Sequence, residues 1–213
     1  MSEQSQTAKF IGVVAENLPE MTTSRRQWWI NHPRELQDFL AKLNDCRWTE
    51  ENGVITFTLP ATDGTTGEQW IARTTKKGNR VGDYAKQVLL SKDFKPTTGV
   101  VYTVKVLKGE LFSDSDRITE KIRKKAKELK FGNLNAEVAC LIRENFTDEE
   151  LEAMGLWWII VMHEPIKDSD SDLDLLDARR SDGGRWLNAC YGSPRHPWDR
   201  GDGFAFSASQ VGA

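Results

Sequence analysis

Five aspartates near the C-terminus recur at a spacing that could hold a hard metal cation. They are Asp168, Asp170, Asp172, Asp174 and Asp177. Carboxylates at alternate positions converge on Ca²⁺ or Mg²⁺ when the backbone closes into a loop. The run departs from the EF-hand pattern, because Leu173 stands where that loop needs glycine and Arg179 where it needs a bidentate glutamate. We therefore expect a solvated acidic loop and no cofactor, with a divalent cation at Asp168, Asp170 and Asp172 as the alternative.

Two basic clusters in the middle of the chain could bind phosphate groups. The first contains Arg73, Lys76, Lys77 and Arg80. The second contains Lys121, Arg123, Lys124, Lys125 and Lys127. Lys and Arg that contact phosphates release condensed counterions, so such clusters are the electrostatic footprint of nucleic-acid binding. The alternative is that Glu120, Lys124 and Glu128, spaced four apart, form ion pairs along a solvated helix.

Aromatic and arginine side chains gather towards the end of the chain. The predicted partner-binding set is Arg185, Trp186, Tyr191, Arg195, Trp198 and Arg200. Trp, Tyr and Arg dominate the energetic hot spots of protein interfaces. The alternative is that these aromatic rings fill the core of a sheet. The adjacent Trp157 and Trp158 point to opposite faces of a strand, which predicts a central strand covered on both sides.

Catalytic chemistry has less support in the sequence. There is no nucleophile-elbow motif, no glycine loop that could cradle phosphate, and no His-Glu pair at helical spacing. His163 and Glu164, close to Asp168, form a candidate general-base site. An ordinary strand end explains them equally well, so an enzyme is the less favoured class.

Residues 65–210 resemble a bacterial protein family that has no established activity. The resemblance rests on the run E-P-I-K-D-S-D-S-D at 164–172 and on R-W-L, Y-G-S-P, W and F-A-F after it. V-G-D-Y-A at 81–85 and the stretch around 136–143 look like the middle of the same family. The resemblance implies no catalytic residues. Relatives are expected to have glycine where this chain has Ser171.

Charge is segregated along the chain, although the net charge is only −3. Residues 68–130 hold 16 Lys or Arg against 8 Asp or Glu, a net charge of +8. Residues 146–213 hold 6 against 13, a net charge of −7. Such asymmetry concerns partners and not the fold. The three cysteines are widely spaced, which favours a reducing cytoplasm. The sequence predicts no membrane span and no signal peptide.

The elements that must position these residues follow from hydrophobic periodicity and capping signals. Helices are predicted at residues 33–43, 69–77, 83–91, 114–130 and 136–145, and in a short segment after Thr147. Strands are predicted at 54–59, 100–107, 156–163, 173–179, 186–191 and 203–209. The fold class is α+β, with a helical middle followed by a C-terminal antiparallel meander. The predicted organisation is a flexible tail (1–22), an N-terminal helix and strand (23–60) and a main domain (65–210).

These patterns favour a cytoplasmic, non-enzymatic binding protein. The first function is a nucleic-acid-associated module that contacts the phosphate backbone through the two basic clusters. The alternative is a protein-interaction module, inhibitor-like or immunity-like, that presents the acidic, aromatic C-terminal face to a basic protein partner. The second alternative is an enzyme whose site lies near His163, Glu164 and Asp168.

Overall fold

The structure, a computed structural model, describes residues 3–16, 20–37, 47–181 and 183–208. Its internal contacts divide the chain into two units, Met1–Cys46 and Arg47–Ala213. In the first unit, α1 (Glu3–Glu16) forms a helix where the sequence predicted a tail, and α2 (Thr23–Asn31) follows it. Residues 33–37 are helical, as predicted, but residues 38–43 of that predicted helix lie outside the described residues.

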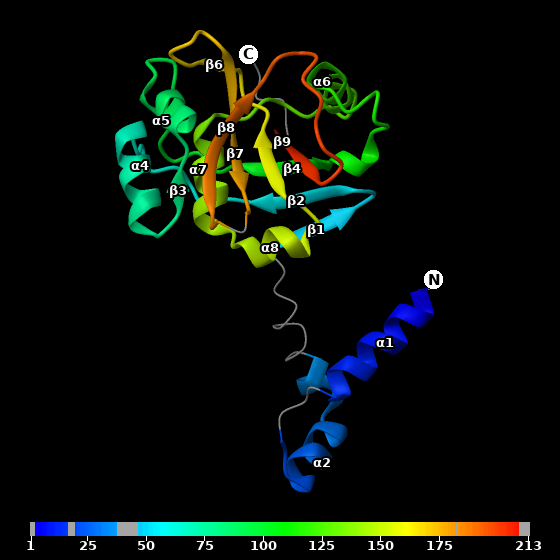
Figure 1. Ribbon diagram of the computed structural model, residues 1–213. Coiled ribbons are helices and arrows are strands. Elements are labelled where there is room, and N and C mark those ends of the chain that lie inside the picture. Colours follow the sequence, from blue (N-terminus) through cyan, green and yellow to red (C-terminus); the bar gives the residue numbers. More distant parts are fainter. Residues whose placement is uncertain (1–2, 17–19, 38–46, 182, 209–213) are drawn as a thin grey trace. The chain divides into compact units, whose positions relative to one another are not determined.

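The second unit is built on one sheet (Figure 1). In the described residues its strand order is β1-β2-β4-β9-β5-β7-β8-β3, and β6 pairs with β7. The strands are β1 (Trp48–Glu51), β2 (Val54–Thr58), β3 (Arg80–Val81), β4 (Thr103–Lys108), β5 (Trp158–Val161), β6 (Ile166–Lys167), β7 (Leu173–Arg179), β8 (Trp186–Tyr191) and β9 (Asp202–Ser207). The sequence had grouped residues 54–59 with the N-terminal segment, but β2 pairs with β4 inside this sheet.

The α+β class is confirmed, but the simple antiparallel meander is wrong. β7 and β8 do form the predicted antiparallel hairpin. The chain then crosses over, and β9 lies between β4 and β5, where it pairs in parallel with β5. β3 adds a second parallel pair at the β8 edge. The sheet is therefore mixed.

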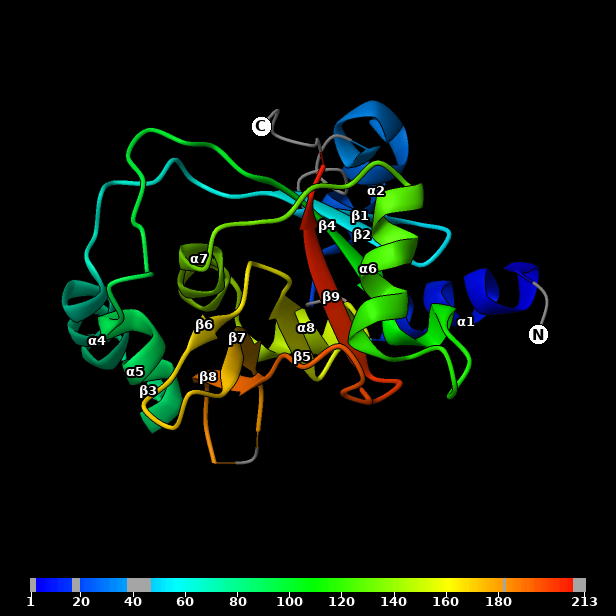
Figure 2. The same cartoon turned by 90° about the horizontal axis from the view of Figure 1, so that it is seen from above.

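Helices cover both faces of the sheet in the second unit (Figure 2). They are α4 (Gly67–Lys76), α5 (Asp83–Leu90), α6 (Thr119–Glu128), α7 (Glu137–Asn145) and α8 (Asp148–Ala153). One hydrophobic cluster joins the sheet to α4, α5, α7 and α8. A second cluster lies on the other face, where Ile122 and Ala126 of α6 pack with Phe204 and Phe206 of β9.

Helix α6 begins at Thr119, five positions later than the sequence predicted. The buried Arg117 side chain instead donates hydrogen bonds to the carbonyl oxygens of Gly109 and Phe112, each at 2.9 Å. These bonds hold the segment before α6 in a turn, because a buried guanidinium must satisfy its donors. None of the helices in the described part of the chain has the length and apolarity to cross a bilayer.

Candidate functional site

Four neighbouring strands place tryptophan and arginine alternately in one row. Trp158 of β5 is paired with Arg179 of β7, and Arg179 is paired with Trp186 of β8. Trp186 is in turn paired with Arg80 of β3. Residues directly opposite one another on paired strands point to the same face of the sheet. The four side chains therefore form a continuous row across β5, β7, β8 and β3.

Two consecutive arginines at the end of β7 each lie over a tryptophan ring. The guanidinium carbon of Arg179 is 3.5 Å from the centroid of the Trp158 ring. That of Arg180 is 4.2 Å from the Trp157 ring. The electron-rich ring face attracts the cation, and the contact restricts the guanidinium to one place.

A third pair completes the cluster, with the guanidinium carbon of Arg80 lying 5.3 Å from the Trp186 ring centroid. We call the whole cluster the Trp–Arg surface. It consists of Arg80, Trp157, Trp158, Arg179, Arg180 and Trp186.

A buried carboxylate anchors the centre of the Trp–Arg surface. Asp177 is fully buried, and its two oxygens accept hydrogen bonds from Nε and Nη2 of Arg179 at 3.1 and 3.0 Å. Burial raises the pKa of Asp177, because removal from water disfavours the charged form, and the Arg179 charge opposes that rise. The ion pair fixes Arg179 and leaves its Nη1 without a hydrogen-bond acceptor among the described residues.

The Trp–Arg surface is hollowed. A cavity of about 490 Å³ is lined by Trp157, Trp158, Arg179, Arg180, Ser181, Trp186 and Asn188. That volume lies within the range of about 300–1,000 Å³ that is usual for ligand sites. Beside it, a hollow of about 330 Å³ shares Trp157, Arg180 and Ser181 and adds Asp148, Glu149 and Glu152.

The hollow is open because α6 covers only part of its face of the sheet. Trp158 borders the cluster that packs under α6, where Ile122 and Ala126 meet residues of β4, β9 and β5. The rest of the row lies further along the strand order, on β7, β8 and β3. Helices α4, α5 and α7 pack on the opposite face. Trp157, predicted to be covered, is 52% exposed, and Trp158 is half-buried.

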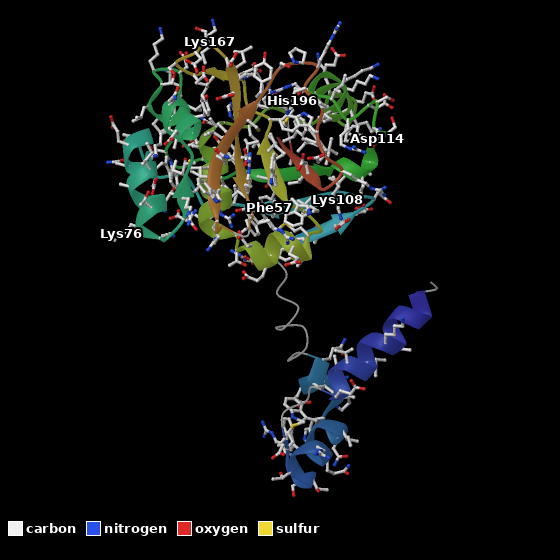
Figure 3. The ribbon with its side chains drawn as sticks, viewed as in Figure 1. Phe57, Lys76, Lys108, Asp114, Lys167 and His196 are labelled. Carbon is white, nitrogen blue, oxygen red and sulfur yellow. The ribbon has the colours of Figure 1, made fainter. Side chains whose placement is uncertain are left out.

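Two of the four members of the first basic cluster are neutralised by carboxylates. Arg73 donates to Glu144 from Nε and Nη2 and also pairs with Asp63. Lys77 pairs with the same Glu144 at 2.6 Å. Lys76 is exposed at the outer end of α4 (Figure 3). Of this cluster, only Arg80 belongs to the Trp–Arg surface.

The second basic cluster lies on α6. Lys121 pairs with Asp116 at 2.6 Å. Arg123 donates to the carbonyl oxygens of Met162 and His163 and is therefore a structural residue. The remaining members are exposed on the helix, namely Lys124, Lys125 and Lys127. Since α4 and α6 pack on opposite faces of the sheet and lie on opposite sides of the view in Figure 2, the described residues do not join the two clusters into one groove.

The predicted partner-binding set is also dispersed. Trp198 is a core residue, only 6% exposed, and its Nε1 donates to Thr119 Oγ1 at 3.0 Å. Arg185 donates to the carbonyl oxygens of Arg143 and Phe146. Only Trp186 lies in the Trp–Arg surface. The exposed members elsewhere are Tyr191, Arg195 and Arg200.

His163 is placed for structure and not for general-base chemistry. Its Nε2 accepts the backbone N–H of Leu176 at 2.9 Å, so Nδ1 carries the proton and donates to the carbonyl oxygen of Glu164 at 2.6 Å. Burial lowers the pKa of His163 to about 4, which keeps the ring neutral at pH 7. Neither ring nitrogen is available to a substrate.

The acidic loop uses its own carboxylates to satisfy the backbone. Asp168 Oδ1 accepts the N–H groups of Asp170 and Asp172, each at 2.9 Å. Ser171 has a φ of 69°, a left-handed conformation that glycine adopts more readily. Among the described residues, no group of three or more His, Cys, Asp or Glu side chains is arranged to hold a metal ion.

Comparison with known proteins finds no match to a family model, to a curated protein or to a solved structure. The resemblance noted from the sequence therefore stays a prediction. Sequence reasoning missed Arg179 and Arg180 as site residues, and it assigned Trp157 and Trp158 to the core. The available signal was the dipeptide W-W inside one predicted strand and the dipeptide R-R at the end of another.

Proposed function

We propose that the protein binds single-stranded nucleic acid on the Trp–Arg surface. The observation that carries this proposal is the alternating row of Trp158, Arg179, Trp186 and Arg80 beside an open hollow of about 490 Å³. Proteins that bind single strands combine aromatic platforms for the bases with cationic groups for the backbone. The row supplies both on the part of a sheet face that α6 leaves uncovered.

The arrangement of the pairs supports stacking of bases. Trp157 is more than half exposed and forms a wall of the hollow. An unpaired base can stack on an indole face or on the plane of an arginine guanidinium. The three Arg-over-Trp pairs hold such planes in place before any ligand arrives, which reduces the ordering cost of binding.

The exposed arginines of the Trp–Arg surface can attract phosphate groups. Arg80 has no carboxylate partner among the described residues. Among the described residues, Arg180 forms an ion pair with Glu152 alone, at 3.3 Å, and that glutamate side chain is 72% exposed. The negative charge of Asp177 is buried under Arg179. The exposed charges of the Trp–Arg surface itself are therefore positive.

Two features favour a single strand over a duplex. Helix α6, which carries the exposed lysines, and strand β3, which carries Arg80, lie on opposite sides of the view in Figure 2, so the described residues form no continuous basic track for a duplex backbone. The rings of the Trp–Arg surface can stack only on bases that are unpaired and splayed out.

The test is fluorescence anisotropy with labelled 12-nucleotide DNA and RNA, as single strands and duplexes, at low and physiological salt. We expect salt-sensitive binding of the single strands. Trp157→Ala should lose ~1–3 kcal/mol of binding free energy, the value of one stacked base. Arg80→Ala should reduce the slope of the logarithm of the binding constant against the logarithm of the salt concentration by about 0.7, the value for one phosphate contact on a single strand.

Matched controls separate the Trp–Arg surface from other exposed groups. Tyr84→Ala removes an aromatic ring that is 50% exposed on α5, and Lys124→Ala with Lys125→Ala removes two cations from α6. Both controls should bind like the wild type. Absence of binding at low salt, or equal losses for Trp157→Ala and Tyr84→Ala, would overturn the proposal.

A second candidate function is protein binding, and the acidic hollow favours it. Asp148, Glu149 and Glu152 lie next to Trp157, a composition that repels phosphate and suits a basic side chain. Titration with a Lys-rich peptide, followed by tryptophan fluorescence, tests this function. Binding that is lost in Glu149→Gln and Glu152→Gln but kept in Arg80→Ala would support the protein partner over nucleic acid.

A further inference from the structure

We infer that α2, in the N-terminal unit, is a second binding site for the same single-stranded nucleic acid. This inference rests on the proposed function and adds a site in a separate part of the chain. The helix repeats the chemistry of the Trp–Arg surface. The guanidinium carbon of Arg25 lies 5.3 Å from the Trp28 ring centroid and 5.5 Å from that of Trp29.

Helical spacing explains this contact. Residues three and four positions apart lie on one side of a helix, so Arg25 faces both Trp28 and Trp29. The helix is held at its start by Thr22, whose Oγ1 accepts the N–H of Arg25 at 3.3 Å. The Arg-over-Trp contact in α2 is therefore local and does not depend on the second unit.

A stacked pair of rings extends along the helix. The His32 ring lies 4.4 Å from the Trp28 ring with an interplanar angle of 16°, and His32 Nδ1 donates to the Trp28 carbonyl oxygen at 2.7 Å. A hollow of about 490 Å³ beside these rings is lined by Thr23, Ser24, Gln27, Trp28, Asn31 and His32. An unpaired base can continue such a stack, and the hydroxyl and amide groups can hydrogen-bond its edge.

The charge of α2 matches a polyanion. The helix contains Arg25 and Arg26 and no acidic residue. None of its residues is buried, and even its apolar side chains are exposed: Trp28 is 38% exposed and Ile30 is 69% exposed. No buried core therefore stabilises α2. Its arginine side chains complement phosphates, and its aromatic rings complement bases. Occupancy of both sites by one strand makes the second contact intramolecular and multiplies the affinity of the first.

The experiment compares a 6-nucleotide and a 30-nucleotide single strand with the full chain. Trp28→Ala should weaken binding of the long strand about tenfold, because the second contact is lost. Trp28→Phe, which keeps a ring, should recover most of that loss. Circular dichroism controls for loss of helix in Trp28→Ala.

A direct readout is ¹⁹F NMR of protein labelled with 5-fluorotryptophan, with resonances assigned by single Trp→Phe variants. Saturating 30-nucleotide strand should shift the Trp28 resonance as well as the Trp157 resonance. A fixed Trp28 resonance, together with an unchanged affinity in Trp28→Ala, overturns this inference while the Trp157 effect leaves the proposed function standing. If neither resonance shifts and Trp157→Ala has no effect, the proposed function fails as well.

Discussion

Arg179 stacks over Trp158 at 3.5 Å while the same guanidinium holds the buried carboxylate of Asp177. One side chain thus joins the hydrophobic interior to the exposed Trp–Arg surface. The register of β5 and β7 places Arg179 directly opposite Trp158, and Asp177 lies two positions before Arg179 on the same face. The position of the surface arginine is therefore set by the core of the sheet.

Replacement of Arg179 should destabilise the fold. Arg179→Leu leaves Asp177 buried without its partner, and breaking a buried ion pair costs about 3–5 kcal/mol of unfolding free energy. Urea denaturation at pH 7 measures the loss. The double variant Asp177→Leu with Arg179→Leu removes both charges and should recover most of the stability, because a hydrophobic pair of similar volume is often neutral. If the double variant is no more stable than the single one, the ion pair is not the cause.

Trp198 should report on stability and not on ligand binding. The side chain is 6% exposed and packs against Phe204 with ring centroids 5.7 Å apart. Trp198→Ala should lose about 3–5 kcal/mol, the usual cost of removing a large aromatic side chain from a core. Trp198→Phe should lose less and should still bind single strands with wild-type affinity in anisotropy. Reduced binding by a fully folded Trp198→Phe variant would instead indicate that Trp198 contacts the ligand.

Local patterns predicted most elements of the second unit but not their arrangement. Residues 173–179 and 186–191 form β7 and β8 with the predicted bounds. The capping box of Thr147 and Glu150 also forms as predicted and starts α8. The insertion of β9 between β4 and β5 depends on contacts between residues far apart in sequence, which local periodicity does not encode.

The candidate site could be predicted only in part for the same reason. Arg80 and Trp186 were both recognised as binding residues, but in separate clusters, and only the parallel pairing of β3 with β8 brings them together. Trp158 and Arg179 meet through the register of β5 and β7. Conversely, Arg73 was assigned to phosphate binding because the sequence does not show that Glu144, 71 residues away, neutralises it.

His163 should make stability depend on pH in the acidic range. Burial lowers the pKa of His163 from 6.5 to about 4. Between these two pH values the imidazole is protonated in the unfolded chain and neutral in the folded chain. The stabilisation is complete above pH 6.5 and is lost as the pH falls towards 4. Urea denaturation of the wild type and His163→Gln should show a stability gap that narrows by about 2–3 kcal/mol between pH 7 and pH 4. A constant gap would show that His163 is charged or solvated in the folded protein.

Asp202 should have the opposite pH dependence. Burial raises its pKa from 3.8 to about 6, and its Oδ2 accepts the N–H of Asp199 at 2.9 Å. Between pH 4 and 6 the folded chain holds a proton that the unfolded chain releases, so the stabilisation by this group is present below pH 4 and falls as the pH rises through 6.

The variant Asp202→Asn keeps an oxygen that can accept the N–H of Asp199 and removes the titration of this side chain. Relative to the wild type, this variant should therefore gain about 2 kcal/mol of unfolding free energy between pH 4 and pH 7. Asp174, whose pKa burial also raises to about 6, is present in both proteins and cancels in that difference. Urea denaturation across this range measures the effect, and a parallel pair of stability curves would contradict it.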